Sequence, residues 1–259
     1  MSQTKAERIR AMKRVEKIAS LTVYDYPMAQ LFDAAGIPFL LVGDSLGMVV
    51  LGYPDTTHVT LDEIIHHVRA VARAKPNALV AADLPINTYR TPEEALASAR
   101  RLVAAGAEAV KAEGGAEIIP QVEAIVRSGI PFCGHIGMLP QTVLQEGGYH
   151  LKGKIEAERS KLLDDARALD RAGAFAIVLE LVAPSVAREV TDAISIPTIG
   201  SASGSGCDGQ ILVSTDLMGT SPGRIPRHVK FKMNGAEAIQ ETVRQWKEMV
   251  IHPPATPTA

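Results

Sequence analysis

The stretches FLLVGDS (39–45), ALVAADLP (78–85) and AEAVKAEGG (107–115) decide the fold of this chain. Each is an apolar run of strand length that ends in charged or polar residues. Four more runs share this pattern: IASLTVYDY (18–26), IPFCGHIG (130–137), FAIVLELV (175–182) and ISIPTIGSASG (194–204). Ionised groups avoid the interior unless they are paired or bind a metal. If the strands are parallel, their C-terminal ends gather on one rim, where barrel enzymes carry their chemistry.

Helical patterns alternate with these runs. Thr91 precedes the periodic segment 92–106 as a predicted N-cap, and Gly106 ends it. The segment 210–219 fits either an eighth strand or a helix, and 235–250 predicts a final helix. This alternation indicates a mostly parallel sheet, and about eight units favour a closed (β/α)8 barrel over an open sheet.

The length and composition fit one large globular α/β domain or two small ones, and α/β barrels run near this length as single domains. The chain has 259 residues, of which 46% are hydrophobic and 22% charged, so a large core forms without a membrane span. Aromatic residues make up only 4%, which predicts the aliphatic core typical of parallel strands. The formal net charge of −2 argues against nucleic acid or an anionic membrane as a partner. We therefore expect one barrel domain over residues 1–259.

The two cysteines bear on the cellular compartment, and the terminal segments bear on the structure of the chain ends. Cys133 and Cys207 lie far apart in the sequence, so a disulfide framework is not expected and a reducing cytoplasm is the default. Residues 1–17 are basic but lack the apolar run of a signal peptide, and predict an amphipathic helix; an organelle transit sequence is the alternative. Residues 252–259 are rich in proline and predict a mobile tail.

Acids at three consecutive strand ends predict a metal site. Mg²⁺ prefers oxygen ligands, usually one or two carboxylates completed by water and substrate. Asp44 and Asp83 supply two carboxylates, and Glu113 on the next strand would bind the ion directly or hold a metal-bound water. Capping of the following helices is the alternative role for a single strand-end aspartate. Three acids together favour the metal.

Three further strand residues are candidates for substrate contact or catalysis. Lys111 shares a strand face with Glu113, and would bind an acid, form a Schiff base or pair with Glu113. His135, between glycines, is a predicted substrate hydrogen-bond donor. Glu180 is the candidate general base, because apolar walls would raise its pKa; a salt bridge to a neighbouring loop is the alternative.

Two glycine-rich loops complete the candidates. Residues 145–154 contain QEGGYHLKGK and predict either a mobile lid over the substrate or an ordinary surface loop. SASGSG at 201–206 resembles a phosphate-cradling loop, although small residues alone are a weak signal.

The order of several short motifs resembles one enzyme family over roughly residues 15–230. These motifs are TVYDYPMA, LLVGDSLGMVVLGY, ADLP, VKAEGG, CGHIGMLPQ, GGY, VLE and DGQILV. Together they resemble the ketopantoate hydroxymethyltransferases, also called 3-methyl-2-oxobutanoate hydroxymethyltransferases.

The resemblance implies a fold, a reaction and a set of roles. The fold would be a (β/α)8 barrel of the phosphoenolpyruvate-binding type with an N-terminal helix. A hydroxymethyl group would pass from 5,10-methylenetetrahydrofolate to 3-methyl-2-oxobutanoate, with Mg²⁺ as cofactor, giving ketopantoate for pantothenate. The family is commonly decameric. The residue roles by motif are metal binding for Asp44, Asp83 and Glu113, substrate contact for Asp44, Ser45, Asp83, Lys111 and His135, and proton removal for Glu180.

The chain also departs from the family pattern. IGSASGSG stands in place of GIGAG, Thr215 in place of a histidine, PRHVKF in place of a PKF-type segment, and INTY follows ADLP. These differences leave open a paralogue acting on another 2-oxo acid. A lyase of the phosphoenolpyruvate mutase and isocitrate lyase type is a rival, although the KKCGH-type loop of those enzymes is absent from the sequence. A barrel that has lost turnover and serves as a binding partner is a second rival.

Overall fold

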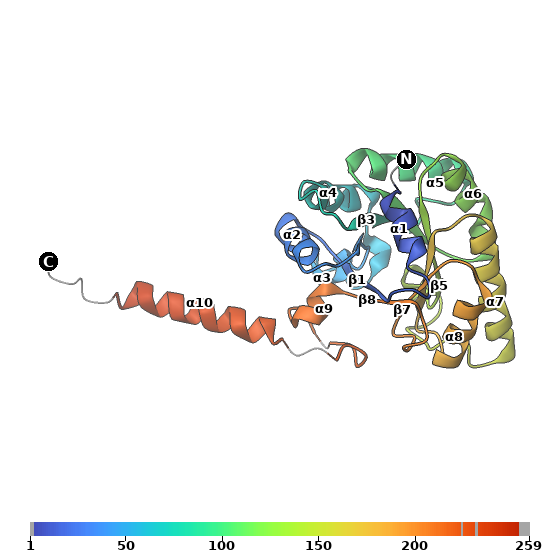
Figure 1. Ribbon diagram of the computed structural model, residues 1–259. Coiled ribbons are helices and arrows are strands. Elements are labelled where there is room, and N and C mark those ends of the chain that lie inside the picture. Colours follow the sequence, from blue (N-terminus) through green and yellow to red (C-terminus); the bar gives the residue numbers. More distant parts are fainter. Residues whose placement is uncertain (1–2, 224, 231–232, 254–259) are drawn as a thin grey trace. The chain divides into compact units, whose positions relative to one another are not determined.

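The computed structural model describes residues 3–223, 225–230 and 233–253. Within them, parallel strands form a closed barrel in which each strand pairs with its sequence neighbours and β8 pairs with β1 (Figure 1). The strands are β1 (Ile18–Thr22), β2 (Phe39–Val42), β3 (Leu79–Asp83), β4 (Ala109–Glu113), β5 (Phe132–Gly137), β6 (Ala176–Glu180), β7 (Thr198–Ser201) and β8 (Gly209–Leu212). The predicted (β/α)8 fold is confirmed.

Helix α1 precedes the first strand, and the helices that come between the later strands surround the barrel (Figure 1). They are α1 (Lys5–Ala11), α2 (Tyr26–Ala34), α3 (Leu46–Val49), α4 (Leu61–Ala72), α5 (Pro92–Ala105), α6 (Ile119–Arg127), α7 (Glu156–Arg171) and α8 (Pro184–Ala193). Short 3-10 turns are η1 (Thr56–His58), η2 (Ala116–Ile118) and η3 (Pro140–Thr142). The predicted caps of α5 are confirmed: Thr91 accepts a hydrogen bond from the amide of Glu94, and Gly106 is left-handed with φ 115°.

An apolar cluster fills the N-terminal end of the barrel. Phe39 and Phe175 meet edge-on there with ring centroids 6.1 Å apart. Ala6 and Ile9 of α1 belong to the same buried cluster, so the helix covers this end of the barrel. The predicted amphipathic helix at 1–17 is thus found, but in the described residues it spans only Lys5–Ala11; its apolar face is buried by the strands.

A buried ion pair fastens the segment after α1 to the same end. Lys13 Nζ lies 3.1 Å from Asp208 Oδ2, and the other carboxylate oxygen accepts the backbone N–H of Arg14 at 3.2 Å. The backbone N–H of Thr198 also donates to Asp208, at 3.0 Å. Since backbone and side-chain donors share this carboxylate, its burial is compensated.

The chain divides into two compact units, residues 1–212 and 213–259. The barrel is the first unit; the second contains α9 (Ser214–Met218) and α10 (Gly235–Ile251). The segment 210–219 therefore contains both predicted structures, the end of β8 and then α9. One domain over residues 1–259 stays a prediction. Most of the predicted tail at 252–259 lies outside the described residues.

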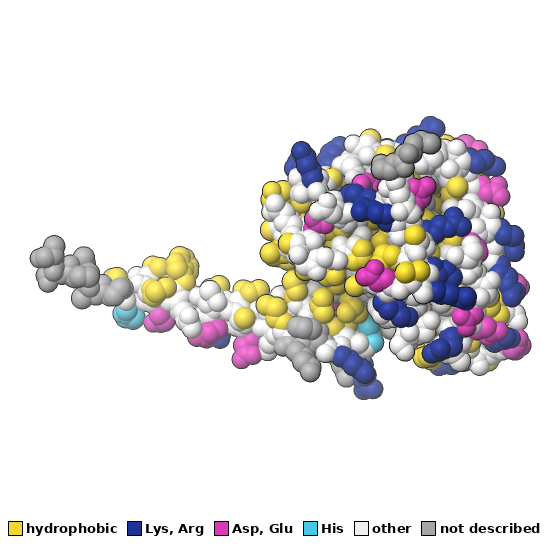
Figure 2. All heavy atoms as spheres, in the orientation of Figure 1, with side chains coloured by type: hydrophobic (Ala, Val, Ile, Leu, Met, Phe, Trp, Pro, Cys, Tyr) yellow, Lys and Arg dark blue, Asp and Glu magenta, His cyan; other side chains and the backbone are white. Residues whose placement is uncertain are grey.

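Helix α10 carries a stripe of exposed apolar side chains, which Figure 2 shows in yellow opposite the acidic ones. They include Ile239, Val243, Trp246, Met249 and Val250. No helix in the described part of the chain is both long enough and apolar enough to span a bilayer.

Candidate active site

The C-terminal ends of the strands bring the predicted site residues together. Asp44 follows β2, Asp83 ends β3, and Glu180 ends β6, while Lys111, Glu113 and His135 lie in β4 and β5. The parallel register pairs Asp83 with Lys111 and Glu113 with His135. All of these side chains except Glu180 are at least 95% buried, and Glu180 is 21% exposed. A buried charged cluster with one accessible carboxylate thus lies at one rim.

Asp44 and Asp83 are directly linked. The backbone N–H of Asp44 donates to Asp83 Oδ2 at 3.0 Å. Burial, followed by the negative charge of Asp83, raises the pKa of Asp44 to about 7, although Lys111 opposes the shift. A carboxyl group with a raised pKa next to a second carboxylate is one whose negative charge is poorly compensated.

Lys111 is the buried cation of the cluster. Its Nζ lies 3.0 Å from Asp83 Oδ1 and 3.1 Å from His135 Nδ1. Burial alone would lower the pKa of Lys111, but the negative charges of Asp83, Glu113 and Asp44 outweigh it and raise the pKa. A firmly protonated amine cannot attack a carbonyl, which argues against the Schiff-base role. Lys111 forms its ion pair with Asp83, and not with Glu113 as one interpretation of the sequence predicted.

His135 connects Lys111 to Glu180. Its Nε2 lies 3.3 Å from Glu180 Oε2. Burial, with a further contribution from the positive charge of Lys111, lowers the pKa of His135, so the ring is neutral. Because Nδ1 accepts from the Lys111 ammonium, the single ring proton is on Nε2, the nitrogen near Glu180.

The electrostatic balance of the cluster favours a bound cation. Asp44, Asp83, Glu113 and Glu180 face one ammonium group, that of Lys111, and uncompensated buried charge is costly. Glu113 Oε1 is buried and accepts no hydrogen bond from the described residues, while Asp83 Oδ1 has the Lys111 ammonium 3.0 Å away. The oxygen donors at Asp44 and Asp83 therefore fit Mg²⁺, which needs only one or two carboxylates from the protein.

The predicted set of three metal ligands is not preassembled. No three His, Cys, Asp or Glu side chains among the described residues are grouped closely enough to hold an ion together. The two linked aspartates with Glu113 beside them agree better with the alternative in which Glu113 holds a metal-bound water. The ligand roles of all three acids stay predictions.

Comparisons with known proteins identify the family. A family model described as ketopantoate hydroxymethyltransferase matches residues 3–254. The 3-methyl-2-oxobutanoate hydroxymethyltransferase of Pyrobaculum islandicum is 54% identical over 89% of this chain and 88% of its own. The enzyme of the same name from Moorella thermoacetica is 48% identical over 96% of this chain and 94% of its own. The chain belongs to the ketopantoate hydroxymethyltransferase family. It is therefore an enzyme of the hydroxymethyltransferase class, as the motifs predicted.

Solved structures similar to the chain share its barrel at low sequence identity. A 2,3-dimethylmalate lyase of the phosphoenolpyruvate mutase and isocitrate lyase superfamily has a TM-score of 0.63 at 19% identity, over 99% of this chain and 93% of its own. A phosphonopyruvate hydrolase has a TM-score of 0.64 at 14% identity, over 99% of this chain and 92% of its own. This likeness agrees with the (β/α)8 barrel fold and shows no more than the fold.

The backbone on either side of Glu180 is held by hydrogen bonds from the loop at 201–206, which departs from the family pattern. Leu181 has a positive φ of 48°, a conformation uncommon outside glycine. Ser203 Oγ donates to the carbonyl of Leu179 at 2.7 Å and accepts the N–H of Val182 at 2.9 Å. The loop at 201–206 therefore fixes the backbone on both sides of Glu180, which explains Ser203 without a phosphate.

Ser45 lies at the rim and contacts a tyrosine that sequence reasoning left without a role. Ser45 is half-buried at the start of α3, and its Oγ lies 2.9 Å from the hydroxyl of Tyr24. Asp25, another polar residue after the first strand, instead caps α2 by accepting the N–H of Met28 at 2.8 Å. The substrate contact of Ser45 stays a prediction.

The segment 145–154 is fastened to the same strand end as Glu180. The N–H of Lys152 donates to the carbonyl of Leu181 at 2.7 Å, and the N–H of Ala183 donates back to Lys152 at 2.9 Å. Tyr149 within this segment has a pKa raised to about 12 by partial burial and then by the charges of Glu180 and Asp44. The lid motion stays a prediction.

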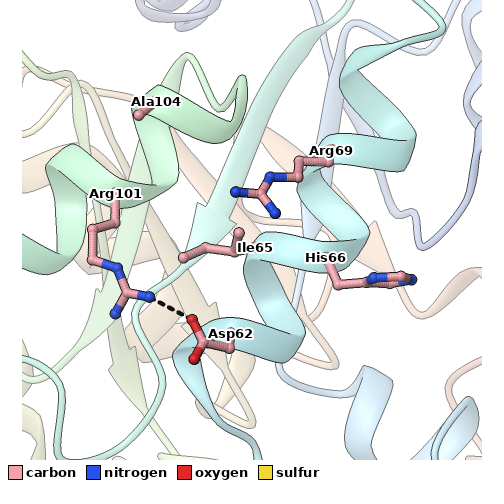
Figure 3. A pocket seen from close by; sticks show the side chains of 6 residues that line it. All are labelled: Asp62, Ile65, His66, Arg69, Arg101 and Ala104. Atoms are coloured by element: carbon pink, nitrogen blue, oxygen red, sulfur yellow. Dashed lines mark hydrogen bonds and ion pairs between the residues drawn. The ribbon is translucent and has the colours of Figure 1, made fainter.

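A separate pocket lies on the outer wall of the barrel (Figure 3). It has a volume of about 370 Å³ and lies between α4 and α5. Its lining residues are Asp62, Ile65, His66, Arg69, Arg101 and Ala104, and Arg101 pairs with Asp62. The lining includes none of the strand-end acids, so this pocket is distinct from the candidate active site.

Proposed function

We propose that this enzyme transfers a hydroxymethyl group from 5,10-methylenetetrahydrofolate to 3-methyl-2-oxobutanoate, giving ketopantoate for pantothenate biosynthesis. The carrying observation is the arrangement of one accessible carboxylate, Glu180, on the same rim as the buried Asp44 and Asp83. The accessible Glu180 can reach a substrate, whereas Asp44 and Asp83 are buried side by side, where a bound cation would keep both ionised.

Asp44 and Asp83 would hold Mg²⁺, with Glu113 beside it. When bound, the ion would supply Lewis-acid polarisation of the keto and carboxylate oxygens of the 2-oxo acid. The Glu113 oxygen that accepts no hydrogen bond from the described residues and the excess negative charge of the cluster support this proposal.

Glu180 would remove the proton from C3 of the 2-oxo acid. The C–H electron pair then passes into the enolate, whose carbon bonds to the one-carbon unit while that unit's two bonds to folate nitrogens break. Water would supply the hydroxyl oxygen, and the two nitrogens would take up one proton from C3 and one from that water. Lys111, with its raised pKa, stays protonated and offsets negative charge on the bound acid. His135, neutral with its proton on Nε2, would orient Glu180 or donate to a substrate oxygen.

The family resemblance also implies an assembly and a location. We infer a homo-oligomer, a decamer by resemblance, in the cytoplasm. The exposed apolar stripe of α10 supports association, because apolar side chains in contact with water favour burial against a partner.

Deuterium exchange at C3 of 3-methyl-2-oxobutanoate, followed by proton NMR, tests the proposal. We expect the enzyme with Mg²⁺ to catalyse exchange and EDTA to stop it. Glu180→Gln should slow exchange by roughly 10²–10⁴-fold, the usual contribution of a general base, while Mg²⁺ binding stays intact. Glu123→Gln, on the exposed face of α6, is the matched control and should exchange as the wild type does.

Each contrary result has a distinct meaning. Exchange at the wild-type rate in Glu180→Gln would remove Glu180 as the base. No exchange by folded, Mg²⁺-loaded wild type would point to another 2-oxo acid, as the departures from the family pattern allow. Cleavage of a hydroxy acid without folate would favour the lyase alternative. Exchange without transfer from methylenetetrahydrofolate would refute the donor.

A further inference from the structure

Gln141 contacts two of the buried acids and has no part in the mechanism above. It lies in η3, directly after β5, and is 2% exposed. Its backbone N–H donates to Glu113 Oε2 at 2.9 Å, and its side-chain Nε2 donates to Asp44 Oδ2 at 2.8 Å. One residue therefore holds carboxylates from the ends of β2 and β4.

The surroundings allow only one orientation of the Gln141 amide. Nε2 also donates to the carbonyl of Leu84 at 3.0 Å, and Oε1 accepts the hydroxyl of Tyr89 at 2.6 Å. A carboxylate and a carbonyl only accept hydrogen bonds, so a reversed amide would place its oxygen against two acceptors. Both amide hydrogens and the carbonyl oxygen are therefore in use.

Tyr89 is in turn held in place. It follows a turn in which Asn87 has a φ of 66° and the Thr88 hydroxyl donates to Pro85 at 2.7 Å. The Tyr89 hydroxyl lies 3.2 Å from the carbonyl of Glu113 as well as 2.6 Å from Gln141. This turn is the INTY segment in which the chain departs from the family pattern.

We propose that Gln141, oriented by Tyr89, is a positioning residue for the divalent cation. It binds Oδ2 of Asp44, leaves Oδ1 of that carboxylate for the ion, and fixes Glu113 beside it. Hydrogen bonds to ligands of this kind fix ligand direction and thereby metal affinity. The inference rests on the proposed function for the nature of the ion, and it concerns binding, not proton transfer.

Calorimetric titration of metal-free enzyme with MgCl₂, without substrate, tests the inference. Gln141→Leu, which keeps the side-chain size, should weaken Mg²⁺ binding by roughly 10–100-fold. Tyr89→Phe removes one hydroxyl and should weaken it by roughly 3–10-fold, the worth of one hydrogen bond. Thr142→Val is the matched control, since among the described residues the Thr142 hydroxyl bonds the carbonyl of Leu139 and the carboxylate of Glu146, and neither of the aspartates.

A second readout separates positioning from general damage. In Tyr89→Phe, the Mg²⁺ concentration for half-maximal C3 exchange should rise, while the rate at saturating Mg²⁺ returns close to wild type. Thermal melting of each metal-free variant shows whether it is folded. If Gln141→Leu does not fold, Tyr89→Phe alone decides the outcome.

The results that overturn the inference differ from those that overturn the proposed function. The positioning role would be refuted if Tyr89→Phe and folded Gln141→Leu bound Mg²⁺ as tightly as the wild type. It would also be refuted if the control Thr142→Val lost as much Mg²⁺ affinity as they do. Absence of Mg²⁺ binding by the wild type would refute it as well. A third outcome separates the two proposals: Gln141→Leu binds Mg²⁺ more weakly, and the wild type binds Mg²⁺ but does not catalyse exchange in 3-methyl-2-oxobutanoate. The positioning role of Gln141 would then stand, and 3-methyl-2-oxobutanoate would be excluded as the acceptor.

Discussion

The two ends of the barrel treat buried charge in opposite ways. At the N-terminal end, Asp208 is compensated by Lys13 and by two backbone N–H groups, and α1 covers the apolar cluster beside it. At the C-terminal end, Asp44 and Asp83 are adjacent and share one ammonium group, that of Lys111. One end thus stabilises the fold, while the other keeps charge that only a ligand would balance.

The largest effect that would break this comparison comes from removing Lys111. Lys111→Met would leave the buried acids with no cation, and breaking a buried ion pair costs about 3–5 kcal/mol. We expect that loss in the free energy of unfolding of the metal-free protein, measured with denaturant, together with loss of C3 exchange. A stable but inactive variant would show that the acids take up protons instead.

Lys13→Met makes the same change at the opposite end. Asp208 keeps its two backbone donors, so the cost should be only about 1–2 kcal/mol, near that of one hydrogen bond to a charged group. Exchange activity should not change. Loss of activity equal to that of Lys111→Met would show that the two ends are coupled.

The second prediction concerns packing without charge. Ile9 of α1 is 2% exposed within the apolar cluster, and Ile9→Ala would leave a cavity that costs about 3 kcal/mol. Denaturant unfolding should show this loss, while Mg²⁺ affinity and C3 exchange stay at wild-type values. Ile9→Val is the milder control, at about 1 kcal/mol. A lower Mg²⁺ affinity in Ile9→Ala would contradict the division between the two ends.

The third prediction asks how far the backbone controls Glu180. Ser203→Ala leaves the buried N–H of Val182 without its acceptor, at a cost of about 1–2 kcal/mol. Displacement of Glu180 should lower C3 exchange by roughly 10–100-fold, the usual effect of a misplaced catalytic group. Ser205→Ala, at an exposed position of the same loop, should leave both quantities unchanged. Equal effects in both variants would exclude a specific role for Ser203.

The apolar runs predicted the barrel because each buried strand is a short local signal. Phe39–Val42 and Leu79–Asp83 lie where their sequences predicted them. The segment 210–219 was ambiguous because a four-residue strand, Gly209–Leu212, is followed at once by a short helix. Neither element is long enough to show its own period.

The residue types of the site were predictable, but their partners were not. Lys111 and Glu113 share a strand, yet Lys111 pairs with Asp83 on the neighbouring strand, because pairing across strands depends on register. Gln141 was part of a quoted motif but had no role, since its contact with Asp44 joins residues far apart in sequence. Only the folded barrel brings a neutral, buried side chain against those acids.

The smallest expected effect is in the rate at which a thiol reagent modifies the two cysteines. Cys133 lies within β5 and Cys207 just before β8, and both are buried and free. Burial raises the pKa of Cys133 to about 12 and raises that of Cys207 as well. Since the thiolate is the reactive form, neither should react with a thiol reagent in the folded protein near neutral pH. Unfolded protein should react fully.

The order in which a thiol reagent slowly modifies the two cysteines compares the opening of a core strand with that of a connecting loop. Cys133 is the second residue of β5, which is paired on both sides, so its exposure requires the barrel to open. Cys207 lies in a connection that opens more locally. Mass spectrometry of labelled peptides should therefore find Cys207 modified first. Ile9→Ala should speed the labelling of both cysteines if opening is global. Faster labelling of Cys133 than of Cys207 would show that the paired strand, and not the connection before β8, opens first.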